Sequence, residues 1–299
     1  MTPGQTFSHP FIITSPQNPR IKNLIRLMSE GRERRLTHSF ALEGAREITR
    51  ALQSGLRPLA SYHCPELLGH DARTALLLME NLTKEEKTHE PFFHEITPAI
   101  FQKIVLRSDK DGLLVVFEAP APRRLAEFLQ DTQVANAPPQ LFLALQGVEK
   151  PGNIGAIVRS ADAFGVDGIV IVTATSGEMV DLYHPHLVRN SLGAVFSQRF
   201  LTLSSDDLVS FCETHGLALV GAALHDQARN FYEVNFSRPM VLLMGSEATG
   251  IDHSLQSRCH RLIQIPMRGL CDSLNVSTAT AVLLSEISRQ RQVLSRNTW

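Results

Sequence analysis

The stretch LFLALQGVEKPGNIGAIVR, residues 141–159, decides the fold of this chain. Its first residues are almost all apolar, which predicts a buried strand over 141–145. A loop with glycine and proline follows, and then a helical pattern of apolar residues over 154–164. A buried strand that runs through such a loop into a helix is the building unit of an α/β domain. The stretch therefore predicts an α/β fold.

The rest of the C-terminal half repeats this alternation of strand and helix. Its strand-like runs are nearly continuous in apolar residues, which is typical of a parallel sheet that helices cover on both faces. Further strands are expected at 169–172, 217–223, 240–244 and 262–265, and further helices at 206–215 and 276–293. The sequence thus predicts a domain with a mostly parallel sheet over residues 140–299.

Residues 1–118 predict a second, smaller α/β domain. Asn18 precedes a proline and apolar residues at helical spacing, a pattern typical of a helix start. Residues 1–15 show no periodicity and are expected to form a loose arm, and residues 119–139 carry four prolines, which indicates a linker. We expect helices at 19–28, 43–52 and 72–82, and strands at 39–42, 58–63 and 113–117.

Composition places the chain among ordinary globular proteins. Of its 299 residues, 43% are hydrophobic and 20% are charged, and that length is typical of two domains. The sequence holds no apolar run of about 18 residues and no pattern of a secretory signal at its start, so neither a membrane helix nor export is expected. The four cysteines are scattered without a CxxC pair. We therefore expect reduced thiols, a cytoplasmic location and no metal site.

The net charge of -1 hides a basic N-terminal region. Residues 1–60 contain nine Lys and Arg against four Asp and Glu, a net of +5, whereas residues 61–118 contain six against ten, a net of -4. A phosphate backbone would be attracted to such a cluster, although a solvated helix face would carry the same charges. The cluster consists of Arg20, Lys22, Arg26, Arg32, Arg34 and Arg35.

The loop after the first strand carries Asn153 and leads to Arg159 on the following helix. Backbone N–H groups at such a helix start can hold an anion. The loop has neither the GxGxxG spacing of a dinucleotide site nor the Gly-Lys-Ser/Thr ending of a Walker loop. Asn153 could cap the helix or contact a substrate. Arg159 could pair with Asp162 on the helix surface or hold a phosphate.

Two further loops follow expected strands and carry polar residues. Gly245 would let a ligand approach the backbone closely, and Glu247 would lie at the carboxyl end of its strand or cap the next helix. In the last loop, polar Ser273, Asn275 and Ser277 alternate with apolar residues; Asn275 could satisfy backbone groups, and Ser277 could cap the final helix. Each loop alone fits an ordinary structural role, but together the three loops predict one site at the end of the sheet.

Taken together, these loops resemble the three motifs of the SpoU (TrmH) family of the SPOUT methyltransferases. Order and spacing agree with the family over about half of the chain. The matching residues are Asn153, Gly155 and Arg159-Ser160-Ala161 in the first motif, Gly245, Glu247 and Gly250 in the second, and Ile265-Pro266-Met267, Gly269 and Ser273-Leu274-Asn275-Val276-Ser277 in the third. Residues 12–55 are also similar, more loosely, to the start of the substrate-binding domain that precedes the catalytic domain in this family.

The resemblance implies a fold and a reaction. Family members carry a parallel sheet with a C-terminal trefoil knot, bind S-adenosylmethionine, methylate the ribose 2′-hydroxyl of RNA, and usually form homodimers whose active sites draw on both subunits. The catalytic residues implied are Asn153, Arg159, Glu247, Ser273 and Asn275. The cofactor-binding residues implied are Gly221, Ala222, Leu224, Met244, Gly245, Ile265, Met267 and Leu274. The RNA-binding residues expected in the basic cluster are Arg20, Lys22, Arg26, Arg34 and Arg35.

Arg159 is the residue that the resemblance places nearest to the reacting hydroxyl. A guanidinium is normally always protonated, so we expect Arg159 to bind the phosphate and orient the hydroxyl, while its action as the base stays the alternative. The chain departs from the family at Lys150, where an acidic residue often precedes the Pro-Gly-Asn run. A slightly different form of a family segment also occurs at 190–194. The apolar part of the last helix, 279–287, could form a dimer interface or pack in the core.

The RNA target and two other classes of function stay open at this point. Ribosomal RNA is expected rather than tRNA, because the separate N-terminal domain resembles a substrate-binding module. A dinucleotide-dependent enzyme is disfavoured by the missing GxGxxG spacing. A non-catalytic RNA-binding protein is disfavoured by the intact set of Asn153, Arg159, Glu247 and Asn275.

Overall fold

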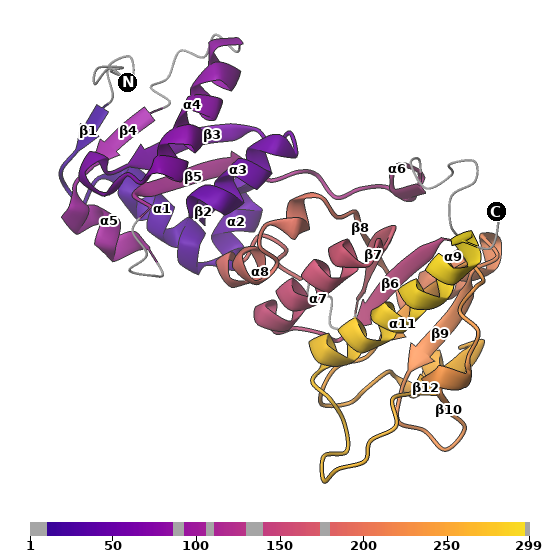
Figure 1. Cartoon of the computed structure of the whole chain (residues 1–299). Helices are drawn as coiled ribbons and strands as arrows, with labels where there is room; N and C mark the ends of the chain where they lie inside the picture. Colours follow the sequence, from indigo (N-terminus) through magenta and orange to yellow (C-terminus); the bar gives the residue numbers. More distant parts are fainter. Residues whose placement is uncertain (1–10, 86–92, 106–110, 130–139, 174–179, 297–299) are drawn as a thin grey trace. The chain divides into compact units, whose positions relative to one another are not determined.

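The computed structural model describes residues 11–85, 93–105, 111–129, 140–173 and 180–296 (Figure 1). Contacts within the chain divide it into two compact units. Unit 1 consists of Met1–Pro120 and Tyr183–Phe196, and unit 2 consists of Ala121–Leu182 and Ser197–Trp299. The N-terminal unit therefore includes a segment from the C-terminal half of the sequence, which the sequence analysis did not predict.

Unit 1 is built on a five-stranded mixed sheet in the order β1-β4-β3-β5-β2. Strand β4 is parallel to β1 and β3, whereas β5 is antiparallel to β3 and β2. The strands are β1 (Phe11–Ile13), β2 (Ser39–Glu43), β3 (Pro58–His63), β4 (Phe93–Ile96) and β5 (Leu113–Glu118). The helices are α1 (Pro19–Ser29), α2 (Gly31–Thr37), α3 (Ala45–Gln53), α4 (His70–Glu85) and α5 (Pro98–Ile104), and the segment from the C-terminal half adds α8 (Pro185–Asn190) and the 3-10 turn η2 (Ala194–Phe196).

Helix α1 shows how local sequence and packing agree in unit 1. The side chain of Asn18 accepts a hydrogen bond from the backbone N–H of Arg20 at 2.9 Å, so the expected helix start is confirmed. The apolar positions of α1 are buried in a cluster with strand residues of the sheet. The expectation of a loose arm over 1–15 is wrong at β1, because three residues are too few to show a strand period; residues 1–10 lie outside the described residues.

Unit 2 is built on a seven-stranded sheet in the order β10-β12-β9-β11-β6-β7-β8, and all of its strand pairs are parallel, which confirms the expected parallel sheet. Strand β11 lies between β6 and β9 although it follows both in sequence. The strands are β6 (Leu141–Gln146), β7 (Gly168–Val172), β8 (Phe200–Leu203), β9 (Ala218–Ala222), β10 (Arg229–Asn230), β11 (Met240–Met244) and β12 (Arg261–Gln264). The helices are α6 (Leu125–Leu129), α7 (Pro151–Ala163), α9 (Ser205–Thr214), α10 (His253–Gln256) and α11 (Val276–Arg296), with the 3-10 turn η3 (Phe231–Glu233).

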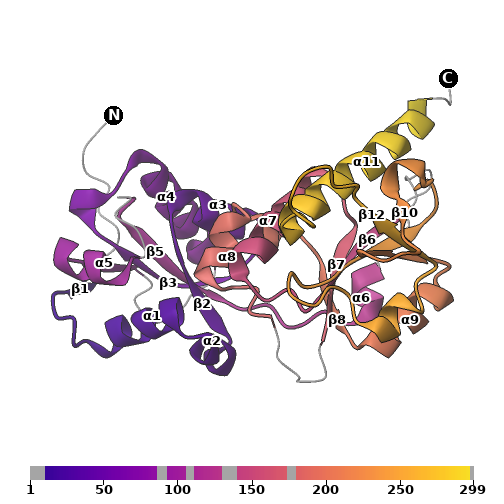
Figure 2. The same ribbon diagram turned by 90° about the horizontal axis from the view of Figure 1, so that it is seen from below.

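Helices cover both faces of this sheet, with α7 and α11 on one face and α6 and α9 on the other (Figure 2). Helix α6 corrects the expected linker at 119–139. Phe128 is fully buried, and its ring lies 5.4 Å from that of Phe142. A Cβ at Gly168 would lie 2.5 Å from the Phe128 ring, so the strand beneath needs a glycine there. Phe128 therefore belongs to the core of unit 2 and anchors α6 there, and residues 130–139 lie outside the described residues.

The apolar residues of α11 pack inside unit 2. Leu283, Leu284 and Ile287 are at most 1% exposed in the single chain. Of the two roles left open for 279–287, core packing is the one that the structure shows. Among the residues described, no helix combines the length and apolar character that a membrane crossing requires.

Candidate active site

The three loops singled out in the sequence follow β6, β11 and β12. These strands belong to one parallel sheet, so their carboxyl ends lie at the same edge. Open α/β sheets place ligands at this edge. The loops meet there, although their polar residues are separated by up to 122 positions in sequence.

Glu247 is the centre of a hydrogen-bond network at this edge. Its Oε1 accepts from the side-chain amides of Asn153 at 3.0 Å and Asn275 at 2.5 Å. Its Oε2 accepts from Nζ of Lys150 at 2.7 Å. The amide of Asn275 also donates to Oδ1 of Asn153 at 3.2 Å. One carboxylate thus ties together residues from all three loops.

Asn275 is fixed from its other side as well. Its Oδ1 accepts from the backbone N–H of Ser277 at 2.9 Å and from the Ser277 hydroxyl at 2.6 Å. Asn275 therefore satisfies the first turn of α11, and Ser277 is not the cap. With both acceptor bonds on Oδ1, the amide nitrogen must point toward Glu247 and Asn153.

The cations and amides around Glu247 set its charge. A hydrogen bond from Lys150, the charge of that lysine and the bond from Asn153 lower the pKa of Glu247, against a smaller effect of desolvation. The carboxylate is therefore ionised near neutral pH, and its oxygens are occupied by three side-chain donors. Such a group holds its neighbours in place and is a poor base.

The structural alternatives for two residues of the network do not apply. Helix α7 has Lys150 at its N-cap position, so Asn153 lies within the first turn and does not cap the helix. Helix α10 begins at His253 after an N-cap at Asp252, so Glu247 does not cap it. The sequence analysis missed Lys150 as a member of the network. The signal that could have revealed it was its departure from the acidic residue common in the family.

Ser273 and Arg159 lie outside the hydrogen-bond network as the structure describes it. Ser273 is exposed and lines the cavity described next. Arg159 is exposed on α7. At 100° per residue, six positions of helix place Arg159 about 120° around the axis from Asn153. The alternative of a pairing with Asp162 is not seen among the described contacts of Arg159, and Asp162 accepts from Ser197 and Gln198.

A cavity of about 340 Å³ lies beside the network. Glu247 and Ser273 reach its wall, and the rest of the lining comes mainly from the ends of β9, β11 and β12 and their loops. Of the residues expected to bind the cofactor, those in the lining are Ala222, Leu224, Met244, Gly245, Ile265, Met267 and Leu274. Lining residues that the sequence analysis did not name include Thr249, Gln256, Ile263, Asp272 and Leu283. Gln256 comes from the short helix α10, for which the sequence showed no period.

Two glycines of the expected set have different roles. Gly221 is buried and absent from the lining, and a Cβ there would lie 3.0 Å from Sγ of Cys259 and from Cδ2 of Leu262. It therefore allows close packing behind the cavity. A Cβ at Gly245 would lie 2.1 Å from the carbonyl carbon of Gly250. Gly245 thus lets the second loop close on itself through the Ser246–Gly250 bridge.

The basic residues of unit 1 fall into different environments. Lys22, Arg26 and Arg35 are exposed on α1 and α2. Arg20 is exposed along most of its length, but its Nη1 lies 2.8 Å from Nε2 of the buried His94. Arg34 is 4% exposed and donates to the carbonyl of Leu27. It holds α2 against α1, so we remove it from the residues expected to contact RNA.

Comparison with known proteins gives matches over both units. Residues 140–285 match the SpoU rRNA Methylase family, and residues 18–114 match the MRM3-like substrate binding domain. The tRNA (guanosine(18)-2′-O)-methyltransferase of Escherichia coli strain K12 is 35% identical over 171 residues, which cover 57% of this chain and 72% of that protein. The 23S rRNA (uridine(2479)-2′-O)-methyltransferase of Streptomyces viridochromogenes is 35% identical over 147 residues; the match covers 47% of this chain and spans half, 50%, of that relative.

A solved structure resembles both parts of the chain. It is the AdoMet-bound rRNA methyltransferase from Sinorhizobium meliloti, with a TM-score of 0.75 and 27% sequence identity. The likeness covers 93% of this chain and 97% of that one.

Proposed function

The chain belongs to the SpoU rRNA methylase family, and from that premise we propose that it transfers the methyl group of S-adenosylmethionine to the 2′-hydroxyl of a ribose in RNA. The observation that carries the proposal is the network around Glu247, which joins residues from three strand-end loops beside one cavity that Glu247 itself lines. Such convergence of polar residues beside a cavity is the mark of a binding or catalytic site.

The cavity fits the proposed methyl donor. Its volume of about 340 Å³ lies in the range of small-molecule sites. Met244, Ile265 and Leu274 offer apolar walls for a purine, and the chain turns from strand to loop at Gly245, where backbone groups are available for hydrogen bonds. When bound, the donor supplies a methyl group on a positively charged sulfur. Leu224, Ala222 and Met267 complete the set of residues that we propose to hold it.

The residues of the network position the ribose and do not accept its proton. Glu247 is ionised and already accepts three hydrogen bonds, so its role is to fix Asn153 and Asn275. The exposed guanidinium of Arg159 can bind the phosphate next to the ribose and orient the hydroxyl toward the methyl group. Transfer forms the bond from the ribose oxygen to the methyl carbon, breaks the bond from that carbon to sulfur, and releases the hydroxyl proton to water.

We propose that two copies of the chain complete each site. Arg159 lies about 120° around α7 from Asn153, so the two side chains of one copy leave the helix in different directions. A second copy could then supply Arg159 to the network of the first. We include two further features in this proposal. A trefoil knot is supported by the position of β11 between β6 and β9. Ribosomal RNA as the substrate is supported by the matches to the SpoU rRNA Methylase family and to the MRM3-like substrate binding domain.

The proposal is tested by methyl transfer from labelled S-adenosylmethionine to ribosomal RNA and to tRNA. The expected result is 2′-O-methylation of ribosomal RNA, which is lost by at least about 10²-fold in Arg159→Ala with the affinity for the methyl donor nearly unchanged. Full activity of Arg159→Ala would remove that residue from the mechanism. A wild-type chain that binds RNA without methylating it would overturn the proposed reaction.

Mixed dimers test the sharing of sites. Arg159→Ala and Asn275→Ala chains are each expected to be inactive. When the two variants are unfolded together and refolded, about half of the dimers contain one chain of each kind. Each of these mixed dimers has one intact site out of two, so about a quarter of the wild-type activity should return. Mixtures that stay inactive, although mixed dimers are present, would place Arg159 and the network of the same copy in one site.

A further inference from the structure

The segment Tyr183–Phe196, which we call the excursion, belongs to unit 1 although it connects two neighbouring strands of unit 2. The chain enters it after β7 and leaves it before β8. Because β7 is parallel to β6, the chain leaves β7 at the sheet edge from which the Asn153 loop also starts. The excursion contains the family-like residues 190–194, to which the reaction proposed above gives no role.

Both ends of the excursion pack on one aromatic ring. Phe40 of β2 is fully buried. Its ring stacks on that of Tyr183 with a centroid distance of 4.3 Å and an interplanar angle of 11°. The centroid distance to the ring of Phe196 is 6.1 Å, with an interplanar angle of 22°. Stacked aromatic pairs add stabilisation beyond the area that they bury. The excursion is therefore a loop closed against β2 at its base.

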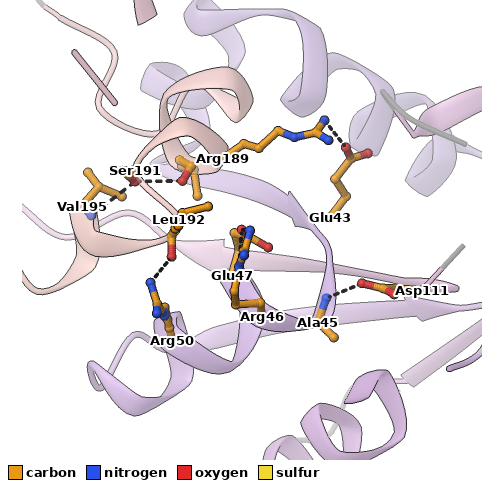
Figure 3. Close-up of polar contacts among 11 residues, drawn as sticks. Glu43, Ala45, Arg46, Glu47, Arg50, Asp111, Arg189, Ser191, Leu192 and Val195 are labelled. Carbon is orange, nitrogen blue, oxygen red and sulfur yellow. Dashed lines mark hydrogen bonds and ion pairs between the residues drawn. The ribbon is translucent and has the colours of Figure 1, made fainter. Parts of the chain in front are cut away.

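The tip of the excursion is held by α3. Nη1 of Arg50 donates to the carbonyl oxygen of Leu192 at 2.5 Å (Figure 3). Gly193 follows with φ of 82°, and a Cβ there would lie 3.1 Å from Cδ and 3.2 Å from Cβ of Arg50. A glycine at this position thus allows the backbone to approach the Arg50 side chain closely.

The conformation of the tip is strained and fixed. Leu192 has φ of 55°, which a residue with a side chain rarely adopts. Ser191 next to it is fully buried, donates its hydroxyl to the carbonyl of Val188 at 2.8 Å and accepts from the N–H of Val195 at 3.4 Å. Such a strained residue persists only where its surroundings hold it. The contact with Arg50 is therefore made by a preformed turn.

An ion pair adds a second polar connection. Nη1 of Arg189 on α8 lies 3.9 Å from Oε1 of Glu43 at the end of β2 (Figure 3). Their side chains are 27% and 20% exposed, so water screens this pair less than it would screen a fully exposed pair. Ring stacking, a backbone hydrogen bond and an ion pair thus hold one short segment.

We propose that Arg50 is a positioning residue for methyl transfer: it fixes the tip of the excursion, the segment that follows β7 at the loop edge of the catalytic sheet. This inference rests on the proposed function. Methyl transfer depends on the fixed geometry of the groups at that loop edge, and a segment held at its base and at its tip limits the conformations that the chain next to the edge can adopt. A loosened excursion leaves both binding steps intact and misplaces the ribose during the transfer itself.

The test separates binding from transfer. Arg50→Ala is expected to lower kcat for RNA methylation about tenfold, while the dissociation constants for RNA and S-adenosylmethionine stay within about twofold of the wild type. Arg50→Lys keeps a donor of the same charge and is expected to recover part of kcat. Arg73→Ala is the matched control, since it removes the same charge from unit 1 and the lost bond is also one from a guanidinium to a backbone carbonyl, that of Leu68, outside the excursion.

Each of the other outcomes contradicts either the positioning role of Arg50 or the proposed function. A wild-type kcat in Arg50→Ala overturns the positioning role. A loss that appears as weaker RNA binding would make Arg50 an RNA contact and also overturns it. A wild-type chain without methyl transfer defeats the proposed function instead, and the two failures are therefore distinguishable.

The ion pair offers a second measurement that does not depend on Arg50. Glu43→Arg and Arg189→Glu each place like charges together and are expected to lower kcat several-fold. The double variant restores opposite charges with their positions exchanged, and it is expected to recover kcat at unchanged RNA affinity. Additive losses in the double variant would show that these residues do not act through each other.

Discussion

The polar residues of the two units are held in opposite ways. In unit 2, Asn153, Glu247 and Asn275 come from three different loops and fix one another. In unit 1, Lys22 and Arg35 lie on two consecutive helices and, as far as the structure describes the chain, neither takes part in an ion pair or a side-chain hydrogen bond. A reaction at one hydroxyl needs fixed directions, whereas attraction of a phosphate backbone needs mainly charge. The two units should therefore differ in how sharply they respond to substitution.

The largest loss of activity is expected from a substitution in the hydrogen-bond network around Glu247. Asn275→Ala removes the donor to Asn153 and Glu247, and we expect kcat to fall about 10²-fold with the affinity for S-adenosylmethionine within a few-fold of the wild type. Steady-state methylation kinetics and calorimetry measure the two quantities. Asn275→Asp keeps the acceptor for Ser277 but brings a second carboxylate to Glu247, so it should be at least as damaging.

Asn235→Ala is the matched control for this prediction. Asn235 is an exposed asparagine of unit 2 whose Oδ1 accepts from the N–H two residues later, as Asn275 does with Ser277. Because Asn235 takes part in that local turn and lies outside the network of Asn153, Glu247 and Asn275, its loss should leave kcat unchanged. Equal losses in the two variants would assign the effect of Asn275 to its cap alone.

The sequence predicted the elements whose signal is local. Runs such as 240–244 are apolar throughout, and strand β11 has the same bounds. Three motifs with long spacing also predicted which loops meet. Strands β1 and β10 were missed, because two or three residues carry no period.

Other features depend on partners far away in sequence. Residues 125–129 were assigned to a linker, because the burial of this helix depends on Phe128 meeting Phe142 and Phe211. Lys150 joined the network only because β11 brings Glu247 beside it. The burial of Arg34 depends on the angle between α1 and α2, which a list of charges does not contain.

An effect of intermediate size is expected at acid pH, where unit 1 should lose folding stability. Burial lowers the pKa of His63 to about 4, and burial together with the charges of Arg20 and His63 lowers the pKa of His94 to about 4. The unfolded chain binds protons near pH 6.5, so folding stability is lost as the pH falls from 6.5 toward 4. Each histidine should cost unit 1 on the order of 2 kcal/mol by pH 5, roughly a thirtyfold rise in unfolding.

Hydrogen exchange at pH 7 and pH 5 measures this difference unit by unit. Peptides from 11–120 are expected to lose protection before peptides of the unit 2 sheet. His94→Gln keeps an acceptor for Arg20 without a titrating ring and should flatten the response of unit 1, whereas His70→Gln, at a side chain 93% exposed, should not. Equal loss of protection in both units would contradict the assignment of acid sensitivity to the buried histidines.

The smallest effects are expected from the exposed basic residues. Lys22→Gln and Arg35→Gln should each weaken RNA binding only a few-fold, and each should reduce the slope of log affinity against log salt by about 0.7–0.9 if the side chain meets a phosphate. Arg34→Gln provides the contrast on the same helix. Because Arg34 is buried against the Leu27 carbonyl, its loss should lower the melting temperature and leave the salt slope intact. An unchanged slope of log affinity against log salt in Lys22→Gln and Arg35→Gln would make that surface a solvated helix face, and RNA would then have to bind elsewhere on the chain.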